Sequence, residues 1–154
     1  MAKAEIKIPE EFLLKVSRLG EQTDTIIAKS IEAGGKVVLA KVRSNLRSVV
    51  GKGLKYKRRS TGELEGALGL SPVKISRKGV HNAKVGFNEP RRKQYAAKGK
   101  RSYYTITNAM LATVLEYGKH GQPAKPFLKP AKTASRKSCR EEMQRTLEEE
   151  IERL

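Results

Sequence analysis

Cysteine and long apolar runs are scarce in this sequence of 154 residues. Its single cysteine, Cys139, excludes an internal disulfide framework and a cysteine-rich metal site, and it favours a reducing compartment. The longest apolar blocks, such as the one that begins at Val37, are far shorter than the roughly 18 residues that a membrane span requires. The N-terminus lacks the apolar core of a signal peptide. We therefore expect a soluble protein that is intracellular when it is made and has no membrane contact.

Groups that could perform catalysis are also few. Aspartate occurs once, at Asp24, and the two histidines, His81 and His120, show no metal-ligand spacing with Cys139. Glu116 has no second carboxylate nearby in the sequence for acid–base work, and no serine lies in a nucleophile-elbow setting. We therefore expect a protein that is not an enzyme, with no catalytic residues, no cofactor and no metal site.

Positive charge is abundant and unevenly distributed. The formal net charge is +17, and residues 51–101 alone contribute +12, against +3 from residues 1–50 and +2 from residues 102–154. Such a concentration attracts polyanions, but it is also typical of a solvated loop surface. The candidate polyanion contacts are the basic residues of two predicted loops, namely Lys52, Lys55, Lys57, Arg58, Arg59, Arg91, Arg92, Lys93, Lys98, Lys100 and Arg101.

The first third of the chain is predicted to be a long helical region that spans residues 8–50. Apolar residues at helical spacing predict a first helix that Gly20 ends, followed by a second, longer helix. The adjacent residues Gly34 and Gly35 lower the helix propensity by roughly 1 kcal/mol each relative to alanine. The pair predicts either a kink or a close crossing of another backbone.

Residues 61–88 are predicted to form a short helix followed by a β-hairpin. Thr61 is the expected cap of the helix, which has acidic residues in its first turn. Alternating apolar and polar residues on both sides of a Lys78-Gly79 turn predict two antiparallel strands. The strand residues expected to face the core are Val73, Ile75, Ala83, Val85 and Phe87. Basic loops are predicted on either side of this block, at residues 51–60 and 89–102.

The last third is predicted to contain two helices, at residues 107–118 and 127–154. Thr107 and Asn108 are good helix-capping residues, and Gly118 is typical of a helix end. The expected core faces consist of Met110, Leu111, Val114 and Leu115 in the first helix and of Ala131, Ala134, Cys139, Met143, Leu147, Ile151 and Leu154 in the second. Four glutamates lie in the last turns of the second helix, where their charge is unfavourable to the helix dipole, which predicts either fraying or contact with a basic partner surface.

These elements predict a single α+β domain over residues 1–154, in which a long N-terminal helix and a C-terminal helix pack on a small antiparallel β-sheet. Two prolines, Pro126 and Pro130, flank Phe127. Because proline restricts the backbone, the phenylalanine ring would dock at little entropic cost. Phe127 is therefore predicted to anchor a joint, either against a neighbouring subunit or in the core of its own chain.

Residues 115–131, LEYGKHGQPAKPFLKPA, resemble a pattern found in tail-component proteins of tailed phages. That pattern reads valine-glutamate-phenylalanine-glycine, then proline-alanine-arginine-proline-phenylalanine-leucine-arginine-proline-alanine. It belongs to the gene-product-ten family of HK-type lambdoid phages, which is related to tail-completion and head–tail joining proteins. Upstream, STGELEGALGLSPVKI and AKVGF resemble the small helix and two strands of that family. The matched positions, called here the joint motif, are Glu116, Tyr117, Gly118, Pro126, Phe127, Leu128, Pro130 and Ala131.

The resemblance implies a structural virion protein, a tail-completion or neck subunit that acts in ring assembly at the head–tail interface, without catalysis. Its partners would be further copies of itself in a ring, for example a hexamer, together with connector or head-completion proteins and tail-tube or tail-terminator proteins. Phage DNA in the channel would be a further partner. The protein would be found in the virion, and in the host cytoplasm during assembly. The charge pattern supports an alternative, a non-specific nucleic-acid-binding protein that uses residues 51–101.

Overall fold

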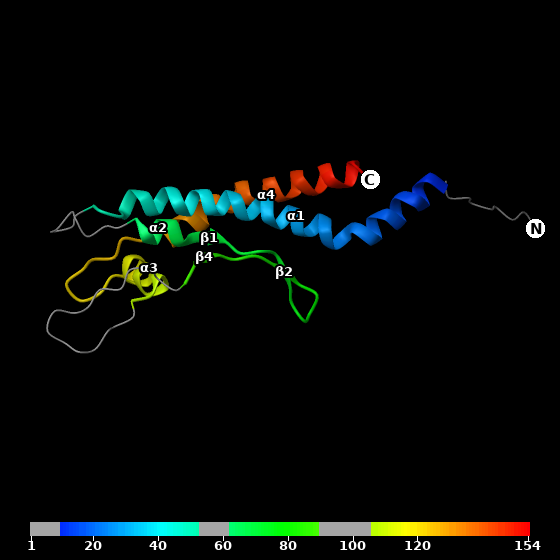
Figure 1. The fold of residues 1–154 in the computed structure, drawn as a ribbon. Helices are drawn as coiled ribbons and strands as arrows, with labels where there is room; N and C mark the ends of the chain where they lie inside the picture. Colours follow the sequence, from blue (N-terminus) through cyan, green and yellow to red (C-terminus); the bar gives the residue numbers. More distant parts are fainter. Residues whose placement is uncertain (1–9, 53–61, 90–105) are drawn as a thin grey trace, which may run out of the picture.

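A computed structural model describes residues 10–52, 62–89 and 106–154 (Figure 1). The predicted α+β class is confirmed, because long N-terminal and C-terminal helices accompany a small antiparallel β-sheet. The helices are α1 (Glu10–Val49), α2 (Glu63–Ala67), α3 (Asn108–Tyr117) and α4 (Leu128–Glu152). The strands are β1 (Leu68–Leu70), β2 (Lys74–Ile75), β3 (His81–Asn82) and β4 (Val85–Phe87). Most of the two predicted basic loops lies outside the described residues.

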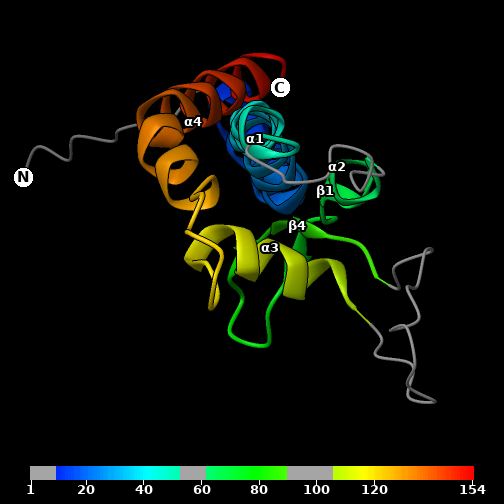
Figure 2. The ribbon, with the colours of Figure 1, turned by 90° about the vertical axis from the view of Figure 1, so that its left-hand side faces the viewer.

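Helix α1 is the scaffold of the fold. Helix α4 runs antiparallel to it on one side, while α2, α3 and the paired strands β1 and β4 lie on the other side (Figures 1 and 2). The hydroxyl of Ser30 donates to the carbonyl oxygen of Met143 at 2.8 Å, and the ammonium of Lys29 lies 2.5 Å from a carboxylate oxygen of Glu150. These contacts fix the register of α4 along α1.

The expectation that Gly20 ends a helix is wrong, because α1 continues through it without a break. A methyl group added at Gly20 would meet nothing within 4 Å. A glycine inside a helix costs only about 1 kcal/mol relative to alanine, so tertiary packing elsewhere along the helix outweighs it.

Gly34 and Gly35 leave space for side chains of two other elements. The atoms nearest to the position of each missing Cβ belong to side chains, so the predicted crossing of another backbone is not what fills this space. A Cβ atom at Gly34 would lie 2.4 Å from Cγ of Met143 on α4, and one at Gly35 would lie 2.7 Å from Cδ1 of Leu70 on β1. Adjacent glycines therefore allow α4 and the sheet to approach two neighbouring faces of the same helix. Glycine is required here by space, because α1 is helical on both sides of the pair.

The predicted antiparallel hairpin is confirmed, with its turn at Lys78-Gly79. Its first strand begins earlier than Val73, the first strand residue predicted to face the core: Leu68 starts β1 and pairs with Phe87. Gly62, in a left-handed conformation, is the N-cap of α2, and Thr61 lies outside the described residues.

The prediction that Ile75 faces the core is wrong, because its side chain is 54% exposed. Leu68 is buried instead, and Val85 and Phe87 pack against the same core. The reason is geometric: β1 and β4, at the base of the hairpin, contact the core, whereas β2 and β3 extend away from it (Figure 1).

The core lies at the C-terminal half of α1, where α2, α3, the start of α4 and the base of the hairpin meet. Its buried members are Val42, Leu46, Leu64, Leu68, Ala112, Phe127 and Ala131. In α3 and α4, three further predicted core residues are exposed, namely Met110, Ala134 and Ile151. In their place the buried faces of α3 and α4 contain polar side chains, namely Asn108, Glu116 and Ser135. Apolar periodicity does not predict burial of such residues, because their hydrogen bonds make burial tolerable.

The acidic end of α4 has basic partners within the chain. Glu150 lies between Lys29 of α1 and Arg153, and Arg145 pairs with Glu142 and Glu149 at 2.5 Å each. The hydrogen bond from Lys29, together with the positive charge of Arg153, holds the pKa of Glu150 below its ordinary value. These contacts lie within the chain, and contact of this end with a basic partner surface stays a prediction.

The close contact between Gly34 and Met143 can be tested with a matched pair of substitutions, Gly34→Ala and Gly20→Ala. Both gain the same intrinsic helix propensity, about 1 kcal/mol, but only the methyl group at Gly34 overlaps Met143. We expect the Gly34→Ala protein to be less stable than the Gly20→Ala protein by about 1–3 kcal/mol, the usual cost of overpacking. Urea unfolding of both variants measures this difference. Equal stabilities would contradict the close contact.

Candidate assembly joint between helices α3 and α4

Glu116, in the last turn of α3, binds the start of α4. Its Oε2 accepts the backbone N–H groups of Phe127 and Leu128, both at 2.8 Å, and its Oε1 accepts that of Lys129 at 2.9 Å. The first N–H groups of a helix have no partner within the helix. A side chain eleven to thirteen residues upstream therefore takes the place of the usual N-cap, and its negative charge lies at the positive end of the helix dipole.

The carboxylate is held in its charged form. Burial, which leaves Glu116 only 6% exposed, raises its pKa. The three backbone N–H donors and the positive charge of Lys129 lower that pKa by more, so the net pKa is below the ordinary value of 4.5. Glu116 is therefore ionised at neutral pH and bound on both oxygens.

The segment between the two helices folds back against the end of α3. Gly118 has a φ of 77°, and a Cβ atom there would lie 2.8 Å from the backbone nitrogen of Ala124. A tight turn follows, in which Lys119 and Gln122 exchange backbone hydrogen bonds of 3.0 and 2.9 Å. The N–H of Lys125 then donates to a carbonyl oxygen near the end of α3 at 2.7 Å. Gly118 is thus required both by its backbone conformation and by space.

Phe127 fills the core of its own chain, the second of the two predicted alternatives. Its side chain is fully buried, and its ring meets that of Phe87 edge-to-face, with centroids 6.2 Å apart. Such a ring pair contributes roughly 0.5–1.5 kcal/mol beyond the area it buries. The side-chain amide of Asn45 donates to the carbonyl oxygen of Phe127 at 3.2 Å. The start of α4 is therefore attached to α3, to the hairpin and to α1.

The remaining joint-motif residues divide into buried and exposed members. Ala131 is buried and Leu128 partly so, whereas Pro126 and Pro130 are exposed. Pro130 lies in the first turn of α4, where the N–H group that proline lacks would have no partner within the helix. Tyr117 is 78% exposed. It is therefore the large joint-motif side chain that is available to another molecule.

Helix α3 is capped in a similar way by Glu89, the first residue of the predicted basic loop 89–102. Oε1 of Glu89, just after β4, accepts the N–H of Ala109 at 2.8 Å. The hydroxyl oxygen of Thr107 accepts the N–H of Met110 at 3.0 Å, which confirms the predicted cap. No local pattern identifies Glu89, because its partner lies twenty residues further along the chain.

The other predicted contact and ligand residues are not brought together. Of the candidate polyanion contacts, only Lys52 is among the described residues, and its carbonyl oxygen accepts a hydrogen bond from the side chain of Lys125. Nε2 of His81 lies 3.2 Å from Oδ1 of Asp24 on α1, and Cys139 lies beside Met143 in the α1–α4 contact. Within residues 10–52, 62–89 and 106–154, no three His, Cys, Asp or Glu side chains are placed to hold a metal ion.

No protein-family model, curated protein or solved structure matches this chain. The joint motif is therefore interpreted from its own geometry. Among the helices in the described part of the chain, none is long and apolar enough to cross a membrane.

The cap by Glu116 predicts a large loss of stability on truncation. Glu116→Ala leaves three N–H groups at the start of α4 without their acceptor, so we expect the free energy of unfolding to fall by about 2–4 kcal/mol. Glu152→Ala, an exposed glutamate at the other end of the same helix, is the control and should change it by less than about 0.5 kcal/mol. Chemical denaturation followed by circular dichroism measures both. Similar small effects of the two substitutions would refute the capping role.

The lowered pKa of Glu116 predicts the pH dependence of this contribution. Because the folded pKa is below the unfolded one, the stabilisation is fully present above the unfolded value of 4.5 and is lost as the pH falls through the folded pKa. The stability difference between the wild type and Glu116→Gln should therefore be largest near neutral pH and shrink below about pH 4. Urea unfolding at a series of pH values tests this; a difference that stays constant would show that the charge is not involved.

Proposed function

We propose that this chain is a structural virion protein of a tailed phage or prophage, a tail-completion or neck subunit that acts in ring assembly at the head–tail interface. The observation that carries the proposal is the joint itself. Glu116, Gly118 and Phe127, three positions on which the resemblance depends, are those that bind the start of α4, turn the chain and fill the core. A motif that specifies a rigid joint suits a protein whose task is to hold its surfaces in a fixed relation.

The joint leaves an apolar surface uncovered on α3. Tyr117 and Met110 are seven residues apart, two helical turns, so they share one face of the helix, and they are 78% and 57% exposed. Exposed aromatic and methionine side chains are enriched where proteins contact one another. This face, adjacent to a rigid joint, supports contact with a neighbouring protein in the neck, such as a tail-tube, tail-terminator or connector subunit.

Helix α4 carries the charge pattern expected of head-to-tail association. Residues 128–140 contain five basic and no acidic side chains, whereas residues 141–154 contain six acidic and two basic ones. A ring requires two different surfaces on each subunit that meet across every contact. The basic first half of α4 and the acidic second half in a neighbour form such a pair, and complementary charges of this kind select the partner and its orientation.

The proposal predicts ring-shaped oligomers, formed by the protein alone or on addition of a tail-tube or connector protein. Arg136→Glu with Arg140→Glu, or Glu148→Lys with Glu152→Lys, should each raise the protein concentration needed for assembly by about tenfold, since each pair makes two like-charge contacts. The four substitutions in one chain should restore assembly, because both surfaces are then reversed together. Mass photometry and negative-stain imaging measure the oligomers.

Two outcomes would contradict the proposal. The first is a protein that stays monomeric both alone and with each neck or tail partner. The second is a fourfold variant that assembles no better than the twofold variants, which would separate the charge pattern from assembly. Unfolding curves of all variants show whether the changes act on folding instead.

A further inference from the structure

The β-hairpin is a cationic arm without acidic residues. Between Glu65 and Glu89 the sequence contains four basic side chains and no acidic one. The four basic residues are Lys74, Arg77, Lys78 and Lys84. All four are exposed, and none of them pairs with a carboxylate in the part of the chain that the structure describes. Unpaired cations gathered on one exposed element form a site for an anionic partner.

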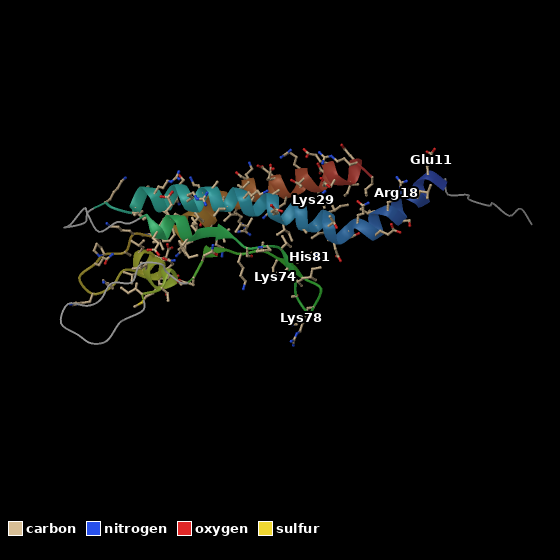
Figure 3. The ribbon with its side chains drawn as sticks, in the orientation of Figure 1. Glu11, Arg18, Lys29, Lys74, Lys78 and His81 are labelled. Carbon is tan, nitrogen blue, oxygen red and sulfur yellow. The ribbon has the colours of Figure 1, made fainter. Side chains whose placement is uncertain are left out.

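The tip of the arm points away from the helices, whereas β3 lies next to α1. Figure 3 shows Lys78 at the tip, where its side chain projects away from α1, and His81 nearer to that helix. The turn is closed by the N–H of Ser76, which donates to the carbonyl oxygen of Val80 at 2.9 Å. Nearer to the helices, Nε2 of His81 lies 3.2 Å from Oδ1 of Asp24 on α1.

The strand register places Lys74 and Val80 on the face of the hairpin that is turned away from α1, called here the free face. Lys74 pairs with Asn82, and Ile75 pairs with His81. Cross-strand partners share a face and successive residues alternate, so Lys74 lies on the face opposite to His81 and therefore opposite to α1. Val80, opposite Ser76 in the turn, shares that free face and is 58% exposed.

We propose that this cationic arm, residues 74–84, contacts duplex DNA. A two-stranded ribbon is narrow enough to enter a DNA groove, and the duplex presents about one negative charge per 1.7 Å along its axis. Lys74, Arg77 and Lys78 bind phosphates on either side of the groove, while exposed aliphatic side chains at the tip contact sugars and base edges. The contact requires no base-specific hydrogen bonds, so the binding is independent of sequence.

The exposed aliphatic side chains favour DNA over an acidic protein surface. Val80, 58% exposed, lies on the same face as Lys74, and Ile75, 54% exposed, is the neighbour of Lys74 on the other face. Side chains of this kind at the end of a basic ribbon are used by proteins that enter the minor groove. An acidic protein surface would match the cations and leave these residues without a role. The inference does not depend on the assembly function, because the arm is separate from both α4 and the exposed face of α3.

Fluorescence anisotropy with a labelled duplex, titrated over a range of NaCl concentrations, tests the proposal. In the variant Lys74→Gln, Arg77→Gln, Lys78→Gln we expect affinity at low salt to fall at least about tenfold. The slope of log Kd against log salt should fall by about 2 to 3, since each lost phosphate contact removes roughly 0.9. The control is Arg18→Gln, Lys36→Gln, Lys41→Gln on α1, three exposed residues outside the proposed assembly surfaces; it removes the same charge and should lower the slope by less than about 1.

Three results would overturn the proposal. Absence of duplex binding by the wild-type chain at low salt is the first. The second is an equal loss in the α1 control, which would show that only net charge matters. The third is displacement of the duplex by poly-glutamate as effectively as by unlabelled duplex of equal charge, which would assign the arm to acidic proteins. The variant Val80→Ser adds a separate readout: it should weaken binding with the salt slope unchanged.

Discussion

The fold depends on one carboxylate that accepts three backbone N–H groups. Glu116 lies in the last turn of α3, and its carboxylate accepts hydrogen bonds from the backbone N–H groups of Phe127, Leu128 and Lys129. A side chain of one helix therefore supplies the acceptor for the free N–H groups at the start of the next. The interaction orients α4 where α4 begins, and the rest of that helix then follows α1 for its full length. Because the donors belong to the backbone, the direction of α4 depends on the position of one side chain and not on which residues form its first turn.

A second carboxylate extends the same device towards the hairpin. Glu89 follows β4 and caps α3, and Glu116 ends α3 and caps α4, so each element fixes the start of the next one along the chain. The glycine pair at Gly34 and Gly35 then lets α4 and β1 close on α1 from two sides. The contacts inside the protein are thereby fixed, and the features left for other molecules are on its surface: the face of α3 with Tyr117, the basic half of α4, the exposed glutamates Glu148 and Glu152, and the cationic arm. The proposed functions use these outer features.

Much of the fold could be predicted from the sequence, because helical spacing, a turn dipeptide and alternation are local patterns. These indicated the α+β class, the hairpin and the helix that Thr107 caps. The errors have a common physical cause, which is that burial is decided by distant partners. Ile75 alternates correctly but lies beyond the core, and Met110 has helical spacing but faces outward. The residues of the joint motif can be identified in the sequence. The role of Glu116 cannot, because a hydrogen bond between residues eleven positions apart produces no periodic pattern.

Amide hydrogen exchange at the start of α4 tests the central claim most directly. The N–H groups of a first helical turn normally exchange quickly, because they have no partner in the helix. If Glu116 holds the joint, the amides of Phe127, Leu128 and Lys129 will exchange as slowly as those in the interior of α4. Exchange of these three amides at the rate of an uncapped helix end, in a chain whose α4 interior is protected, would contradict the account.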